Sequence, residues 1–134
     1  SSAPEPPRPR CCYLIRAAGS SSAFMPLVRL FAQKTLQKAI PLKSLQAKLC
    51  GIWGVNKKTT KLIVTRVDDW TGEEFAEDVY VSIRAKATPE RTRDVVLESC
   101  RAVQAAFKDE GLIANVRLET YVGDSYFHVP PPSS

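Results

Sequence analysis

Residues 26–32 (PLVRLFA) form the first regular pattern in this sequence of 134 residues. The stretch is rich in residues that favour strands and is apolar on both faces, which is typical of a strand inside a sheet. Four of the ten prolines lie in the first nine residues and three lie near the end, so only three remain in between. The sequence therefore predicts a compact domain that begins at this stretch and lies between proline-rich ends.

The first half of this domain is expected to contain a strand, a helix and a second strand. After residues 26–32, apolar residues recur at spacings of three and four and predict a helix with Pro41 in its first position. Gly54 is placed to end this helix, because glycine favours the position that follows a helix C-terminus. Residues 61–67 (KLIVTRV) are β-prone and predict the second strand.

The second half repeats this order. Residues 79–86 (VYVSIRAK) alternate apolar and polar side chains, which predicts a third strand with one polar face. Thr88 as N-cap and Pro89 in the first position predict the start of a second helix, which ends near Gly111. The apolar stripe expected on this helix consists of Val96, Cys100, Val103 and Phe107. Alternation over residues 116–122 predicts the fourth strand.

The predicted fold class is α+β, with the order β-α-β-β-α-β. Two helices would cover one face of a four-stranded sheet. The first two strands are too apolar for their other face to be left to water. We therefore expect neighbouring copies of the chain to cover that face.

Charge and cysteine usage argue against several kinds of site. The net charge is +5, and the densest basic stretch of the domain, residues 57–66, is interpreted as a solvated strand edge, so a nucleic-acid partner is not expected. The four cysteines form no C-x-x-C motif and His128 is the single histidine, so we expect no metal, no cofactor and no Cys-His catalytic pair. No apolar run reaches the ~18 residues of a membrane span, so no membrane partner is expected.

The sequence is expected to divide into three parts: an N-terminal extension at 1–25, a domain at 26–128 and a proline-rich tail at 129–134. The extension is rich in Ser, Ala and Arg with one acidic residue. It is interpreted either as a mitochondrial-type presequence or as a remnant of cloning or upstream translation. Cys50 and Cys100 read as reduced core thiols, which favours an intracellular location, cytoplasmic or organellar.

Ferredoxin-like domains, including RNA-recognition modules, share the predicted element order. Such modules need an aromatic-rich signature on an inner strand, on which bases stack. The candidate strand, residues 79–86, offers only Tyr80. A ferredoxin-like RNA-binding module therefore remains an alternative prediction, although the sequence lacks the aromatic signature of such modules.

A second group of proteins is indicated by residues 25–30 (MPLVRL), together with 56–69 (NKKTTKLIVTRVDD) and 115–121 (NVRLETY). These stretches resemble the tautomerase superfamily, the group that contains 4-oxalocrotonate tautomerase and macrophage migration inhibitory factor. The resemblance covers residues 25 to about 127. It implies a homotrimer, no cofactor and keto-enol tautomerisation of a small anionic α-keto acid.

By the same resemblance, Pro26 would be the catalytic base and Lys57 would bind the substrate carboxylate. Arg117 and Glu119 are two apart on a strand and project from the same side. They fall where the inhibitory factor has a tyrosine and an asparagine, so its own substrate preference does not transfer. Arg117 would polarise a carbonyl or hold a second carboxylate, and Glu119 would position water. The alternative is a surface pair without a role.

The position of Pro26 makes this chemistry conditional. While residues 1–25 are attached, its nitrogen is an amide without useful basicity. Enzymatic activity is therefore expected only if residues 1–25 are removed. Otherwise the chain is expected to be a non-catalytic signalling or assembly subunit of the same fold.

Overall fold

The structure is a computed structural model that describes residues 26–72 and 76–132. The secondary-structure elements, in chain order, are β1 (Leu27–Gln33), α2 (Leu42–Trp53), the 3₁₀ helix η2 (Lys57–Thr59), β2 (Lys61–Val67), β3 (Val79–Lys86), α3 (Arg93–Asp109), β4 (Ala114–Tyr121) and the 3₁₀ helix η3 (Gly123–Ser125). The predicted α+β class and the β-α-β-β-α-β order are confirmed.

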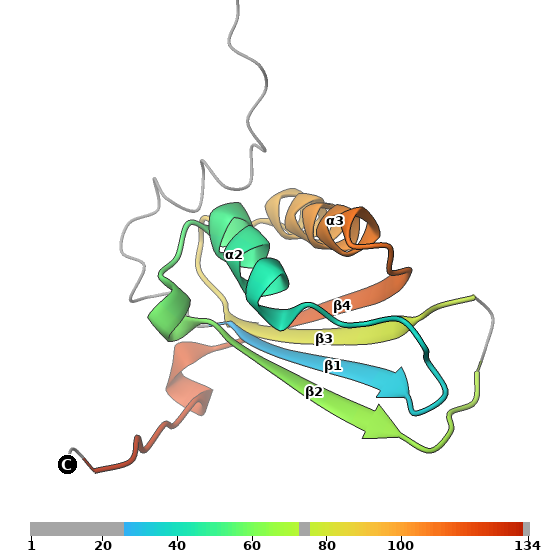
Figure 1. The fold of residues 1–134 in the computed structure, drawn as a ribbon. Helices are drawn as coiled ribbons and strands as arrows, with labels where there is room; N and C mark the ends of the chain where they lie inside the picture. The colour runs from blue at the N-terminus through green and yellow to red at the C-terminus, as the bar shows by residue number, and fades with distance from the viewer. Residues whose placement is uncertain (1–25, 73–75, 133–134) are drawn as a thin grey trace, which may run out of the picture.

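The strands form one sheet in the order β2-β1-β3-β4. β1 pairs in parallel with β2, β3 pairs in parallel with β4, and the central pair β1 and β3 is antiparallel. Both helices lie on one face of this sheet (Figure 1). Each helix thus connects two strands that are direct neighbours, whereas the β-α-β units of ferredoxin-like domains are split by another strand. The sheet order argues against the ferredoxin-like alternative.

The core lies between the sheet and the two helices. Along β1 and β3, alternate side chains are fully or almost fully buried beneath the helices, as the period of two requires. The largest fully buried side chains are Trp53, Phe107, Leu30, Leu45, Leu49 and Ile83. The other side of the sheet, called the open face below, carries no described helix. Its side chains on β1 are half-buried.

The first helix, α2, ends as predicted but begins one residue later. Pro41 is the N-cap and Leu42 is the first helical residue. Gly54 adopts the left-handed conformation (φ 67°), and its N–H donates to the carbonyl of Cys50. This cap directs the chain toward η2, whose N-cap Asn56 accepts a hydrogen bond from the backbone of Lys58 at 2.8 Å.

The predicted start of the second helix is wrong. α3 begins at Arg93, and its N-cap is Thr92, whose side chain accepts a hydrogen bond from the Val95 N–H. Thr88 instead opens a separate turn, which the Arg91 N–H closes on its carbonyl at 3.0 Å. The buried stripe is therefore Val95, Ser99, Val103, Ala106 and Phe107, so Val96 and Cys100 are only half-buried.

Candidate functional site

Pro26 is buried and immediately precedes β1, one of the two central strands. Because β1 and β2 are parallel, both begin at the same end of the sheet, with Leu27 opposite Lys61. η2 carries Lys57 and lies directly before β2, so it reaches this same end (Figure 1). Gln46 of α2 donates to the carbonyls of Thr60 and Lys57 at 2.9 and 3.2 Å, which holds η2 in place. The predicted pair Pro26 and Lys57 is thus brought to one end of the sheet.

Further basic side chains gather at this end, which we call the basic end. Arg84 faces Leu27 across the central pair, and Lys86 ends β3 two residues further on. The Arg91 guanidinium donates to the carbonyl of Lys86. Burial lowers the pKa of Arg91 to about 10, against the opposing effect of nearby carboxylate charge, so this guanidinium stays charged at neutral pH. The basic end is defined by Lys57, Lys61, Arg84, Lys86 and Arg91.

Most of this charge is left available to an anion. Arg84 forms an ion pair with Glu119, and both side chains are well exposed at a separation of 3.4 Å. Lys57, Lys61 and Lys86 form no ion pair with a described residue. Reasoning from the sequence missed Arg84, Lys86 and Arg91, because only the strand register places them beside the start of β1.

Arg117 and Glu119 lie on the open face of β4, as their spacing predicts. Glu119 is opposite Arg84 and Arg117 is opposite Ser82. Since β4 is two strands away from β1, these residues lie on the order of 10 Å to the side of the β1 backbone. One chain alone therefore does not bring Arg117 and Glu119 into contact with Pro26.

Arg117 instead lines a cleft on the open face, toward the far end of β1. Its guanidinium lies 5.5 Å from the centre of the Tyr80 ring, a cation–π contact. Tyr80 also meets Phe31 edge to face, with ring centres 6.0 Å apart. This cleft has a volume of ≈ 470 Å³, and Trp70 is one of the residues that line it.

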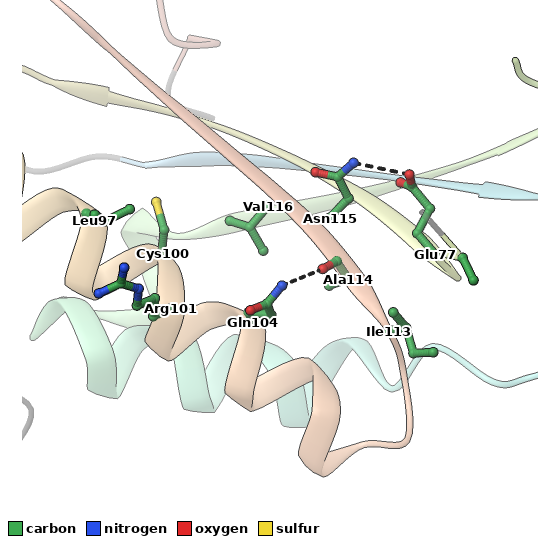
Figure 2. Close-up of a pocket in the computed structure, with 10 residues that line it drawn as sticks. Glu77, Leu97, Cys100, Arg101, Gln104, Ile113, Ala114, Asn115 and Val116 are labelled. Atoms are coloured by element: carbon green, nitrogen blue, oxygen red, sulfur yellow. Dashed lines mark hydrogen bonds between the residues drawn. The ribbon is translucent and has the colours of Figure 1, made fainter. Parts of the chain in front are cut away.

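A second cleft, of ≈ 440 Å³, lies between α3 and the outer edge of β4 (Figure 2). We call it the edge groove. Gln104 of α3 donates to the carbonyl of Ala114 at 3.0 Å, and Asn115 donates to Glu77 at 3.1 Å. Leu97 and Val116 supply apolar walls.

Within residues 26–72 and 76–132, no group of three or more His, Cys, Asp or Glu side chains is placed to hold a metal ion. In the same part of the chain, Cys50 is buried and Cys100 is half-buried, and neither forms a disulfide with a described residue. No helix that the structure describes is long and apolar enough to cross a membrane.

Comparison with known proteins defines the class of fold. No family model and no curated protein matches the sequence. The structure, however, matches solved structures of the tautomerase superfamily over most of its length. The chain therefore has the tautomerase fold, and the resemblance seen in the sequence is confirmed at the level of the fold.

Three of these structures show how far the similarity extends. A 5-carboxymethyl-2-hydroxymuconate isomerase from Deinococcus radiodurans R1 is 17% identical, with a TM-score of 0.57 over 81% of this chain and 92% of that one. Macrophage migration inhibitory factor of Toxoplasma gondii is 11% identical, with a TM-score of 0.52 over 76% and 95%. N1, a member of the cis-3-chloroacrylic acid dehalogenase family, is 12% identical, with a TM-score of 0.56 over 76% and 79%. These similarities show a shared fold. The activities in the names are those of the three matched proteins.

Proposed function

We propose that this chain is a tautomerase that interconverts the keto and enol forms of a small anionic α-keto acid. The base would be the Pro26 amine, once residues 1–25 are removed. The observation that carries this proposal is the position of Pro26, which is buried at the start of a central strand, at the same end of the sheet as the basic end. The tautomerase fold supports the reaction class.

The chemistry follows from the surroundings of the Pro26 nitrogen. As a free secondary amine in a partly dry, cationic site, it would have a pKa below that of an amine in water, because burial and neighbouring cations both disfavour its charged form. The neutral amine would take a proton from the carbon next to the ketone and return one to the enolate oxygen. Lys57 would hold the substrate carboxylate, with Lys61 and Lys86 adding to the attraction.

Arg117 and Glu119 would join this site only from another copy of the chain. In their own chain they lie two strands away from Pro26, on the open face. A homotrimer whose copies cover one another's open face would bring them to a neighbouring Pro26. In that setting Arg117 would polarise the substrate carbonyl or hold a second carboxylate, and Glu119 would position water.

The test uses a chain that begins at Pro26 and measures keto-enol interconversion of phenylpyruvate. We expect activity from this chain, and loss of nearly all of it in Pro26→Gly, because a primary amine lacks the constrained secondary amine of proline. Pro89→Gly, at an exposed loop position, is the matched control and should keep its activity. Equal rates for the Pro26-terminated chain and Pro26→Gly would remove proline from the mechanism.

A second candidate function is a non-catalytic signalling or assembly subunit with the same fold. The feature that favours it is the peptide bond between Met25 and Pro26, which makes the Pro26 nitrogen an amide. Intact-mass measurement of the natively produced protein separates the two candidates. A mass that starts at Pro26 supports the enzyme, and a mass that retains residues 1–25 supports the subunit.

A further inference from the structure

The edge groove carries opposite charges toward its two ends. Figure 2 shows Glu77 at one end, beside the start of β4, and Arg101 of α3 toward the other. Glu77 Oε1 accepts a hydrogen bond from Asn115 at 3.1 Å, whereas Glu77 Oε2 is buried and accepts none from a described residue. Arg101 is exposed and forms no ion pair with a described residue. Because a buried carboxylate oxygen needs a donor, the groove favours a ligand with a cationic N–H group at one end and an anionic group at the other.

The outer edge of β4 lies between these two charges. The Val79 N–H donates to the Ile113 carbonyl at 3.1 Å, so Ile113 turns this carbonyl toward β3. Backbone groups of successive residues in a strand point to opposite sides, so those of Ala114 and Val116 face outward. The Gln104 side chain confirms this by donating to the Ala114 carbonyl from α3 at 3.0 Å. Since β4 is the last strand of the sheet, Val116 offers a donor and an acceptor with the geometry that an added strand needs.

Exposed apolar side chains flank this edge. Leu97 of α3 is 43% exposed, and Ile113, directly before β4, is 56% exposed. Figure 2 shows them toward opposite ends of the groove, with Leu97 on the side of Arg101 and Ile113 on the side of Glu77. A ligand that pairs with the edge would therefore cover apolar surface at both of its ends.

The dimensions of the groove select a short ligand. Seven residues separate Leu97 from Gln104, which corresponds to roughly 10 Å along α3 at about 1.5 Å per residue. An extended peptide rises about 3.3 Å per residue, so about three residues cover this length. The groove volume of ≈ 440 Å³ lies in the range of sites for small molecules. A free peptide of this length has a cation at one end, an anion at the other and backbone groups that pair with a strand in between.

We propose that the edge groove binds a short free peptide of about three apolar residues as an added strand parallel to β4. Its N-terminal ammonium group donates to Glu77 Oε2, and its C-terminal carboxylate lies at Arg101. Its backbone pairs with Val116, and its side chains cover Leu97 and Ile113. The ligand is a separate small molecule, so the inference does not depend on the chemistry of Pro26 or on the number of copies in the assembly.

The experiment titrates the full chain with trileucine that has free ends, followed by calorimetry and by the backbone amide signals in NMR spectra. Binding should be saturable, and the signals of Ala114 and Val116 should be among those that shift most. Acetylation of the peptide N-terminus should weaken binding by on the order of tenfold or more, because it removes the charged donor to a buried oxygen. Amidation of the C-terminus should weaken it by about two- to fivefold, because Arg101 is exposed to solvent.

Two variants assign the ends of the peptide. Glu77→Gln should weaken binding of trileucine about as much as acetylation does, and acetylation should have no further effect on this variant, because both changes remove one interaction. Arg101→Gln should stand in the same relation to amidation. Asp109→Asn and Lys108→Gln lie at the exposed end of α3, outside the groove lining, and are the matched controls that should bind like wild type. Circular dichroism checks that each variant is folded.

Methylated peptides test the pairing with β4. Successive N–H groups of an extended peptide point to opposite sides, so methylation of the second or of the third nitrogen should weaken binding unequally. Equal effects would overturn the added strand, as would binding of free leucine with the affinity of trileucine. The absence of saturable binding at millimolar trileucine would overturn the site. An acetylation effect that persists undiminished in Glu77→Gln would overturn the assigned orientation of the peptide.

Discussion

Two glycines of the helical layer should respond in opposite directions to the same substitution. Gly51 lies in the last turns of α2, and Gly111 follows α3 in the left-handed conformation (φ 79°). A Cβ added at either position would meet no atom within 4 Å, so neither substitution creates a steric clash with neighbouring groups. The two sites therefore differ in backbone conformation alone.

The expected magnitudes follow from that difference. At Gly51, alanine should stabilise the protein by about 0.8–1 kcal/mol, because it favours the helix interior. At Gly111, a side chain in the left-handed region costs roughly 1–2 kcal/mol, partly offset by about 0.4–1 kcal/mol from the restricted unfolded chain. The net effect is a destabilisation of about 1 kcal/mol. For a domain of this size, 1 kcal/mol corresponds to roughly 3–4 °C in Tm.

The assay is thermal and urea unfolding followed by far-UV circular dichroism. Gly51→Ala should raise Tm and Gly111→Ala should lower it, with unchanged dependence on urea concentration. Gly111→Asn should lie between wild type and Gly111→Ala, because asparagine tolerates the left-handed region better than alanine does. Shifts of the same sign for Gly51→Ala and Gly111→Ala would refute the assignment of a helical and a left-handed backbone to these two positions.

Three further predictions concern the core, an interhelical contact and a helix cap. Leu30→Ala should reduce the free energy of unfolding by about 2–5 kcal/mol, whereas Leu42→Ala, at a 38% exposed side chain, should cost about 1 kcal/mol; urea unfolding measures both. Hydrogen bonds from Lys48 and the Ser44 hydroxyl lower the pKa of Glu110, so its stabilisation is present above pH 4.5 and is lost as pH falls through the lowered value. The Tm difference between wild type and Glu110→Gln should therefore shrink between neutral pH and pH 3, and a constant difference would contradict this coupling. Thr92→Ala should lower the free energy of unfolding by about 1 kcal/mol and Thr88→Ala by much less, because Thr92 is the N-cap of α3. Equal losses of stability in the two variants would instead favour a helix that starts at Thr88.

The strands were the most predictable part of the fold. β2 and β3 were predicted over residues 61–67 and 79–86 and have these bounds in the structure. The reason is local: a β-prone run and a period of two are visible without any tertiary contact. The fold class followed from the order of these elements and from the resemblance to the tautomerase superfamily.

The start of α3 shows where local signals fail. Thr88 and Thr92 are both good N-caps, and Pro89 favours the first of them. The structure uses Thr92, and this choice places Val95 and Ser99 against the sheet in place of Val96 and Cys100. Propensity differs little between the two starts, whereas burial depends on which face of the helix meets the core.

The candidate site divides in the same way. Pro26 and Lys57 were named from the resemblance to the tautomerase superfamily, and the parallel pairing of β1 and β2 puts the start of β1 and the residues before β2 at one end of the sheet. Arg84, Lys86 and Arg91 could not be predicted, because their place beside Pro26 depends on the antiparallel register of β1 and β3 and on the turn before α3. Arg117 and Glu119 stay site residues only by proposal, since a neighbouring copy would have to supply them.

The sequence by itself determined the strands, the helix that ends at Gly54, the shared side of Arg117 and Glu119, and the amide state of Pro26 in the full chain. These features depend on side-chain period, on backbone chemistry and on residues close together in the chain. Only the tertiary structure decided the sheet order, the basic end, the separation of Arg117 from Pro26 and the exposure of the apolar side chains that follow β4. Those features depend on which strands pair and which surfaces stay uncovered, and that is set by burial summed over the whole domain.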